Sequence, residues 1–314
     1  MNRAIPLTTG SYIETTPKAT IVITTKNRVA DLVVAIKSVL EQSVECEVIV
    51  IDDGSTEATA VDIPANFPTI RYIRHEESAG YIVRRNEGAD VASCEIIFSI
   101  DDDAAFQCRD TVAQTLAEFN DLRVGAVAIP FIDVRKGTAI QQLAPSSDGI
   151  FVTGAFIGTA HALRRTTFQQ LGGYRSFFCH QGEEGDYCVR MLDKGYVVRL
   201  GRAEPILHFE SPKRDFRRMD FYGRRNDILF YWFNAPFLAL PFALAGTIVN
   251  GLRHGLRCKR FSVMAQGLVS GLFAIRLVLN KRAPVSRECF ALFRQLKNLR
   301  CIEIEKVERF LKKA

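Results

Sequence analysis

The stretch IIFSIDDD, at residues 96–103, most constrains the fold, because an apolar run ends there in three consecutive carboxylates. A short apolar run of this kind predicts a buried strand. In open α/β sheets, ligands bind in the crevice beyond the carboxyl ends of the strands. We therefore expect the acids to lie at a functional site. On its own, the cluster is equally compatible with an acidic loop or a helix start.

The spacing of the acids indicates a metal site. Asp101 and Asp103 are separated by one residue, so both carboxylates can approach one divalent cation while Asp102 points elsewhere. Carboxylate oxygens suit Mg²⁺ or Mn²⁺, and Mg²⁺ usually completes its shell with substrate phosphates and water. The sequence therefore predicts a Mg²⁺ or Mn²⁺ site here.

The residues before this stretch predict a βαβ unit. Residues 19–25 (ATIVITT) are mostly β-branched, residues 29–40 place apolar side chains at helical spacing, and residues 46–51 (CEVIVI) return as a strand. Such a crossover is right-handed, with parallel strands. We expect further strands at residues 70–75, 95–100, 124–132 and 196–200, and helices after Gly80 and at residues 110–120.

The predicted strand ends bring polar groups to one sheet edge. They are Thr25 to Arg28, Asp52 with Asp53, and the acids at 101–103. A Rossmann dinucleotide site needs G-x-G-x-x-G after the first strand, and TTKNR contains no glycine. A Walker lysine motif is absent from the sequence as well, so NAD, FAD and P-loop nucleotide binding are excluded.

Charge divides the 314-residue chain into an acidic body and a basic tail. Residues 211–314 hold 21 basic and 7 acidic residues, against 20 and 28 in residues 1–210. A basic tail fits an anionic surface, either phospholipid or nucleic acid. The eight cysteines lack zinc-site spacing, which indicates reduced, mostly buried thiols. The N-terminus lacks the apolar core of a signal peptide, so we expect a cytoplasmic protein.

The tail contains an uncharged apolar run at residues 228–249 that is long enough to span a bilayer. Its residues Asn234, Pro236 and Pro241 disfavour one straight helix, so a monotopic contact with an anionic leaflet fits better. A second apolar stretch follows at residues 261–279, and the alternative is that both stretches form helices packed on the protein body. Residues 288–313 predict one amphipathic basic helix. The apolar content of the tail favours lipid over nucleic acid.

Motifs in a fixed order carry a family resemblance. They are TIVITTKNR, VIDDGS, GYIVRRNEG, SIDDDA, GAFIGTAHALRR, LGGY, GEEGDYCVR, HFESPKR and RRNDILFYWFNAP. Together they resemble glycosyltransferase family 2, the inverting nucleotide-sugar transferases with the GT-A fold. The resemblance implies an α/β catalytic domain with a mostly parallel sheet at residues 19–225. A polar lead-in at residues 1–18 precedes it, and a helical, basic, membrane-associating region at residues 226–314 follows it.

The resemblance also implies roles for individual residues. Asp52 and Asp53 recognise the nucleobase, and Arg85 approaches the diphosphate or the ribose. Asp101 and Asp103 hold the metal, with help from His208. The expected donor-binding residues are Thr25, Arg28, Asp52, Asp53, Arg85, Asp102 and Arg214. A surface charge at Arg85 and a core histidine at position 208 are the plainer alternatives.

The acceptor hydroxyl is a poor nucleophile, so a carboxylate must take its proton. The family pattern places this base in a Glu-Asp pair, and this chain has Glu183-Glu184 instead. Alignment to the motif favours Glu184 over Glu183. Asp186 and Arg190 stand four residues apart and are expected to pair along a helix.

We therefore expect a metal-dependent inverting hexosyl- or deoxyhexosyltransferase at the inner face of the cell membrane, acting in cell-surface polysaccharide synthesis. Its donor would be a UDP- or dTDP-sugar and its acceptor a glycan or a lipid-linked glycan. The alternative is a non-catalytic scaffold of this family in a membrane glycan-assembly complex. A nucleotidyltransferase would require a Gly-rich phosphate loop that TTKNR does not provide.

Overall fold

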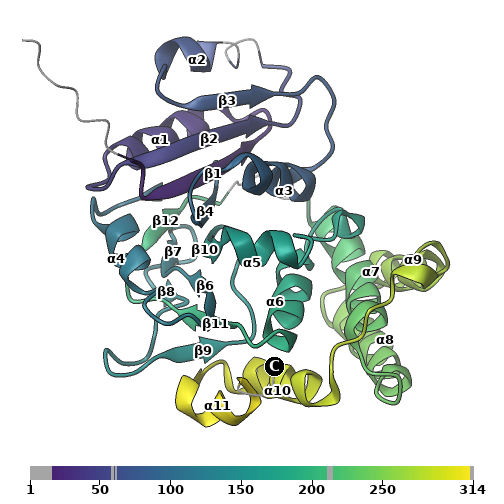
Figure 1. Ribbon diagram of the computed structural model, residues 1–314. Coiled ribbons are helices and arrows are strands. Elements are labelled where there is room, and N and C mark those ends of the chain that lie inside the picture. Colours follow the sequence, from purple (N-terminus) through teal and green to yellow (C-terminus); the bar gives the residue numbers. More distant parts are fainter. Residues whose placement is uncertain (1–15, 58–59, 61, 211–214, 312–314) are drawn as a thin grey trace, which may run out of the picture.

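The computed structural model describes residues 16–57, 60, 62–210 and 215–311 (Figure 1). Its first half follows the predicted βαβ pattern. Strands β1, β2, β3 and β4 are parallel neighbours, with Thr25 of β1 opposite Asp52 and Thr24 opposite Asp101. The elements are β1 (Ala19–Thr25), α1 (Val29–Leu40), β2 (Cys46–Asp52), α2 (Ile63–Asn66), β3 (Arg71–Arg74), α3 (Tyr81–Val91) and β4 (Ile96–Asp101).

The two faces of β1 are buried in different cores. Ile21 and Ile23 pack with α1 on one face, whereas Val22 packs with α3 on the other. Successive side chains of a strand point to opposite faces, so a strand covered on both sides is apolar throughout. This double coverage fixes the strand ends that form the pocket edge.

The main sheet is mixed, and the expectation of a mostly parallel sheet is wrong in this respect. Its strand order is β13-β9-β11-β6-β10-β4-β1-β2-β3, and parallel and antiparallel pairs are equal in number. Strand β10 (Ala160–Arg164) begins opposite the end of β4, with Ala160 facing Ile100, so it must run back in the opposite direction. The remaining strands are β6 (Val124–Ala128), β9 (Phe151–Thr153), β11 (Val197–Leu200) and β13 (Ile302–Glu303).

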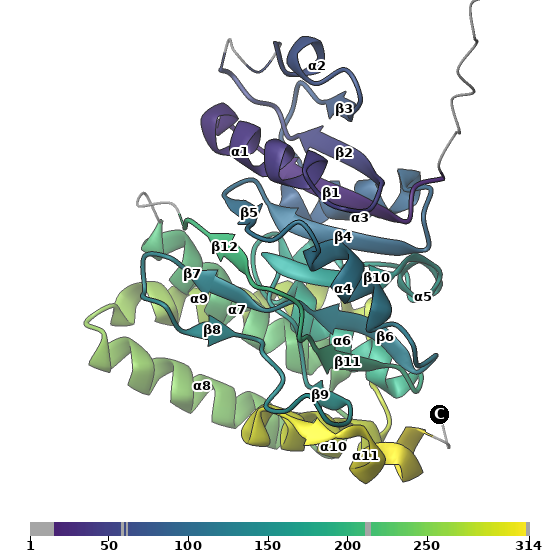
Figure 2. The same cartoon turned by 90° about the vertical axis from the view of Figure 1, so that its left-hand side faces the viewer.

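A second, four-stranded sheet stands beside the first (Figure 2). The single strand expected at residues 124–132 is divided between the two sheets, with β6 in one and β7 in the other. Pro130 lies between them and has no N–H to continue a ladder. The small sheet contains β5 (Ala104–Phe106), β7 (Phe131–Asp133), β8 (Ile140–Gln141) and β12 (Ile206–His208).

Helices cover the sheet and form the C-terminal region. Figure 1 shows α7, α8 and α9 together on one side of the sheet, with α10 and α11 along its far end. The helices are α4 (Thr111–Ala117), α5 (Arg165–Gln170), α6 (Glu183–Asp193), α7 (Phe216–Asn234), α8 (Leu240–Arg257), α9 (Phe261–Ala274), α10 (Arg287–Leu299) and α11 (Ile304–Leu311).

The C-terminal apolar run is divided between two helices. Helix α7 ends at Asn234 and α8 begins at Leu240, with Pro236 in the connection. Among the described residues, no helix is long and apolar enough to cross a membrane.

The single helix expected at residues 288–313 is wrong. Arg300 adopts a φ of 67°, which ends α10, and strand β13 follows before α11 begins. The expectation of mostly buried thiols is also wrong, because only Cys94, Cys188 and Cys289 are buried.

Candidate active site

A pocket of about 730 Å³ lies at the carboxyl ends of β1 and β4 and is lined by many charged and polar side chains. Its walls come from the main sheet, the small sheet, α3, α6 and the start of α7. This is the crevice position that open α/β sheets use for ligands. The lining residues used below are Thr25, Arg28, Asp53, Arg85, Asp101, Asp102, Asp103, Glu184, His208, Asp215, Arg218 and Met219.

Asp101, Asp103 and His208 form a three-residue cluster in this pocket. One ligand atom from each lies within 4.8 Å of the others. Asp101 ends β4, and pairing of β12 with β5 brings His208 from the small sheet. Two carboxylates and one imidazole are a suitable donor set for a divalent cation such as Mn²⁺. The structure thus brings together the three residues that the sequence assigns to a metal site.

Charge within the cluster shifts the pKa values of two of its members. Nε2 of His208 lies 3.4 Å from Oδ1 of Asp103. Burial opposes the ionised form of Asp103, but the contact with His208 prevails and lowers the pKa of the carboxyl. Burial likewise opposes protonation of His208, and Asp103 raises the pKa of the imidazole in spite of it. The contact therefore favours the ionised form of Asp103 and the protonated form of His208.

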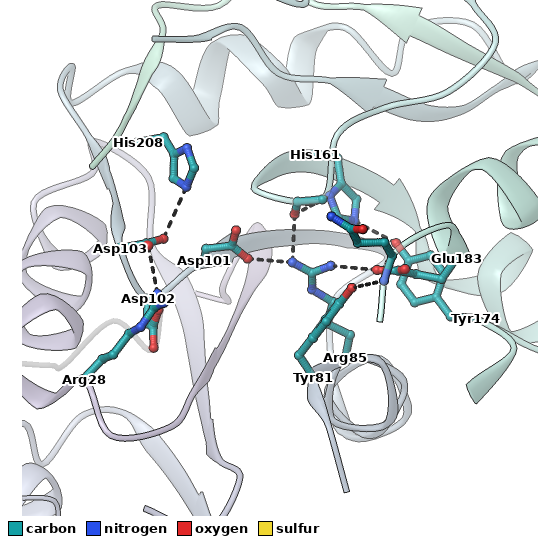
Figure 3. A network of polar contacts seen from close by, with 12 residues as sticks. Arg28, Tyr81, Arg85, Asp101, Asp102, Asp103, His161, Tyr174, Glu183 and His208 are labelled. Atoms are coloured by element: carbon teal, nitrogen blue, oxygen red, sulfur yellow. Dashed lines mark hydrogen bonds and ion pairs between the residues drawn. The ribbon is translucent and has the colours of Figure 1, made fainter. Parts of the chain in front are cut away.

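Asp102 faces away from the cluster and toward β1. Its carboxylate accepts hydrogen bonds from Thr25 Oγ1 at 2.7 Å and from Arg28 Nη1 at 3.1 Å. Arg28 also donates to Oδ2 of Asp103 at 2.8 Å. Burial raises the pKa of Asp102 to about 7, against the opposing charge of Arg28. Thr25, Arg28 and Asp102 thus form one hydrogen-bonded unit at the pocket wall. Figure 3 shows Arg28 beside Asp102 and Asp103.

The two acids at the end of β2 have different environments. Asp53 lines the pocket and accepts from Ser78 Oγ at 2.5 Å and from the backbone N–H groups of residues 79 and 80. Asp52 is fully buried behind it and accepts from Ser55 N at 2.8 Å and Tyr72 Oη at 2.8 Å. Of the two predicted base-recognition residues, only Asp53 lines the pocket.

The adjacent arginines of α3 have separate partners, as their helical positions require. Arg84 donates from Nε to Asp53 at 2.7 Å and fixes that carboxylate from behind. Arg85 lines the pocket, and its Nη2 donates to Oδ1 of Asp101 at 2.6 Å and to the carbonyl of Gly158 at 3.1 Å. Arg84 is not among the site residues that the sequence predicts.

The acidic pair begins α6, and its two members differ in exposure. Glu184 lines the pocket and is half-buried, whereas Glu183 is fully buried with Oε1 3.5 Å from Arg85 Nη1. Burial raises the pKa of both carboxyls, and Arg85 counteracts this rise. The neighbouring Glu184 carboxylate raises the pKa of Glu183 further. Figure 3 shows Arg85 between Asp101 and Glu183.

Asp186, the third acid of α6, is hydrogen-bonded to side chains outside the pocket. Arg190 Nε donates to Asp186 Oδ2 at 3.0 Å, which confirms the predicted pairing along the helix. Asn234 Nδ2 donates to the other oxygen at 2.8 Å, and Arg175 also contacts it. Asp186 is therefore committed to packing α6 against α7.

A buried histidine supports the pocket from behind and was not found from the sequence. Nδ1 of His161 donates to the carbonyl of Gly158 at 3.1 Å, so Nε2 accepts from Tyr174 Oη at 2.9 Å. Burial, aided by the Arg85 charge, lowers the pKa of His161 well below its ordinary value, and the ring is neutral. Its apolar sequence neighbours gave no signal of this role. Arg214, another predicted donor residue, lies outside the described residues.

Comparison with known proteins agrees with this geometry. The family model for Glycosyl transferase family 2 matches residues 20–182. No curated protein matches the sequence. Among solved structures, the mannosyltransferase PcManGT from Pyrobaculum calidifontis, in complex with GDP-Man and Mn²⁺, is similar with a TM-score of 0.56 and 20% identity, over 91% of this chain and 81% of that one. Residues 1–349 of S. aureus TarS, in complex with UDP-GlcNAc, are similar with a TM-score of 0.56 and 13% identity. This match covers 82% of this chain and 92% of the TarS chain. The expected GT-A-like α/β fold with a C-terminal helical region is thereby confirmed.

Proposed function

The chain belongs to glycosyl transferase family 2, and from this membership we propose that it moves a hexosyl or deoxyhexosyl group from a nucleotide-diphosphate sugar to an acceptor hydroxyl with inversion. The donor is a UDP- or dTDP-sugar, and the acceptor is a glycan or a lipid-linked glycan of cell-surface polysaccharide synthesis. The solved neighbours bind GDP-Man and UDP-GlcNAc, which supports a nucleotide-sugar donor without selecting the base.

The convergence of Asp101, Asp103 and His208 carries this proposal. These residues would hold Mg²⁺ or Mn²⁺. Such a cation opposes the negative charge that builds on the leaving diphosphate. Arg28 and Arg85 supply fixed positive charge at the same pocket wall, so the chain itself contributes to leaving-group stabilisation.

Donor binding is assigned to the wall formed by β1, β2 and α3. We propose that Asp53 recognises the nucleobase and that Arg84 holds its carboxylate in place. Thr25, Arg28 and Asp102 act as one unit beside the phosphates. Asp52 supports this wall from its buried position, and Arg214 is retained as a donor-site residue from the family pattern.

We assign the catalytic base to Glu184. The pocket position of its carboxylate supports this choice over Glu183, whose burial and contact with Arg85 suit a positioning role. Burial raises the pKa of Glu184, and a carboxylate with a raised pKa is a stronger base than an ordinary one. One base on the acceptor side matches a single, inverting displacement.

The decisive experiment is transfer from UDP-sugars to a glycan acceptor, with the anomeric configuration of the product read by NMR. We expect an inverted product, loss of turnover in EDTA and recovery on addition of Mn²⁺. Donor binding without transfer or hydrolysis under any tested condition would instead favour the non-catalytic scaffold. A retained configuration would contradict the single displacement.

The region assignment follows the same proposal. Residues 19–225 form the catalytic domain, and residues 226–314 associate with the cytoplasmic face of the membrane. The basic charge of residues 211–314 supports this location, because the cytoplasmic leaflet carries anionic lipid.

A further inference from the structure

Helix α8 has one face packed on its neighbours and one face open. On the packed side, a Cβ at Gly251 would lie 3.2 Å from both Arg224 Cδ and Leu268 Cδ1, and one at Gly255 would lie 3.0 Å from Phe261 Cα. Such close approach requires small residues at these positions. The glycines therefore seat α8 tightly against α7 and α9, and the orientation of its other face is fixed.

The open face carries large apolar side chains that are exposed to solvent. Phe242 is 81% exposed, Val249 53% and Leu256 64%, and in the connection before the helix Phe237 is 78% exposed. Along the helix, successive members follow at intervals that keep them on one side. We define the α8 face as Phe237, Leu238, Phe242, Val249, Arg253 and Leu256.

Along the chain, the charges of α8 and of the residues that flank it have a single sign. Residues 228–287 contain eight Lys or Arg residues and no Asp or Glu. Arg253 lies on the face between Val249 and Leu256, and Arg257 follows one turn later, both exposed. Exposed aromatic and aliphatic side chains beside basic ones are typical of helices that lie in the interface of an anionic bilayer.

We propose that the α8 face docks on the surface of an anionic lipid bilayer, with α8 lying in the plane of the membrane. Phe237, Leu238 and Phe242 enter the headgroup region, and Arg253 with Arg257 pairs with lipid phosphates. At 1.5 Å per residue an 18-residue helix gives a contact about 27 Å long. This inference rests on the proposed function for its purpose, which is to bring the pocket to a membrane-held acceptor.

A second copy of the chain is a poorer occupant of the same face. A twofold interface places the same patch on both subunits, so the basic residues of one α8 face would meet those of the other, and residues 228–287 of neither copy contain an acid to pair with them. An anionic bilayer provides apolar and negatively charged groups together. Charge complementarity therefore selects lipid.

Helix α7 connects the α8 face to the active site. Asp215, Arg218 and Met219, at its beginning, line the pocket, and its end leads through Pro236 into Phe237 and Leu238. Asn226 of α7 donates to the carbonyls of Phe178 and His180 at 2.8 Å each, which fixes α7 to the catalytic body. Docking through α8 consequently holds the pocket at a defined orientation above the lipid.

The test is flotation of the full chain with phosphatidylcholine vesicles, with and without phosphatidylglycerol, in the absence of donor. We expect binding to the anionic vesicles that weakens with salt. The double variant Phe237→Ser/Phe242→Ser should lower partitioning about tenfold or more, since two large apolar side chains leave the contact. Arg253→Ser/Arg257→Ser should remove the preference for anionic lipid. The control Leu122→Ser changes an 82% exposed leucine outside the α8 face and should leave binding unchanged.

The outcomes that overturn the docking proposal differ from the one that overturns the proposed function. Absence of vesicle binding, or binding that the α8-face variants do not change, removes this surface as the membrane contact. A dimer in lipid-free solution that Phe237→Ser/Phe242→Ser converts to monomer assigns the face to a second copy. Transfer to a soluble acceptor is measured separately and should survive these variants. If the unaltered chain binds vesicles but transfers no sugar, only the proposed function is refuted.

Discussion

Arg85 donates from Nη2 to Oδ1 of Asp101 across 2.6 Å, so a buried cation of α3 contacts the last residue of β4. The same guanidinium lies 3.5 Å from Glu183 at the start of α6 and 4.9 Å from the ring centre of Tyr81. Arg85 therefore joins the proposed metal side of the pocket to the proposed base side. Its charge acts on both.

The first prediction concerns this double role. Arg85→Gln should lower kcat/KM about 100-fold, as expected for loss of a fixed charge at a reacting centre. Burial already raises the pKa of Glu184, and Arg85 is the charge that lowers it. Removing that charge should shift the acidic limb of the pH–rate profile to higher pH. Arg85→Lys keeps a positive charge and should therefore reverse part of this shift. If the pH–rate profile of Arg85→Gln matches that of the unaltered chain, the Arg85 charge does not act on Glu184.

The second prediction concerns metal-linked donor binding. With UDP and Mn²⁺ together, the unaltered chain should show a higher Tm than with either alone, because ligands that bind the folded state stabilise it. Asp103→Asn removes one of the three clustered donors and should abolish this combined shift. The matched control is Asp110→Asn, an exposed residue whose side chain makes no capping hydrogen bond. If Asp103→Asn retains the shift, Asp103 is not a ligand.

The third prediction separates the two glutamates by their exposure. Glu184→Gln should lower kcat by about 10² to 10⁴ with donor affinity preserved, which is the usual effect of losing a general base. Glu183→Gln should reduce kcat less, since that side chain does not line the pocket. Isothermal titration with a nonhydrolysable donor measures affinity beside the rate. The reverse ranking of the two variants would move the base to Glu183.

The fourth prediction uses the raised pKa of Glu183 as a stability term. The folded state holds the proton of this buried carboxyl more tightly than the unfolded chain, whose carboxyl titrates near about 4.3. Its contribution to stability is thus present below that pH and is lost as pH rises through the folded pKa. The free energy of unfolding of Glu183→Gln, compared with that of the unaltered chain, should therefore increase as pH rises. Denaturant midpoints at pH 5 and pH 8 measure this, and a constant difference would refute it.

The fifth prediction concerns the contact between α3 and β1. A Cβ at Gly88 would lie 2.4 Å from Cγ1 of Val22, a buried side chain. Val22 lies on β1, which is paired with β2 on one side and with β4 on the other. Gly88→Ala should therefore cost about 1–3 kcal/mol of unfolding free energy, as overpacking does. Gly246→Ala is the control, because nothing lies within 4 Å of its Cβ and alanine favours a helix interior. In urea unfolding, Gly88→Ala should lower the free energy of unfolding relative to the unaltered chain, whereas Gly246→Ala should raise it.

Local patterns were sufficient to predict the first half of the fold. The strand at residues 19–25 and the helix at residues 29–40 have the expected bounds because apolar periodicity and burial agree there. Pro130 and Arg300 mark the two failures. At Pro130 a continuous apolar run crosses between sheets, and at Arg300 a residue with no evident tendency to end a helix adopts a positive φ.

The site was predicted as a set of residues more readily than as a set of contacts. Asp101, Asp103 and His208 could be grouped because a family pattern names them. The contact of Arg85 with Glu183 joins residues almost a hundred positions apart, and no local pattern encodes it. The same holds for Arg84 and Asp53, whose pairing depends on how α3 turns over the end of β2.

Strand β13 closes the edge of the main sheet by pairing with β9, with Ile302 opposite Val152. A ribosome delivers β9 long before β13, so a growing chain displays the open edge of β9 throughout the synthesis of α5 to α10. Open edges recruit other strands. Residues from α5 to α10 must therefore be synthesised before this edge is covered, so the nascent chain carries an unpaired strand during that interval.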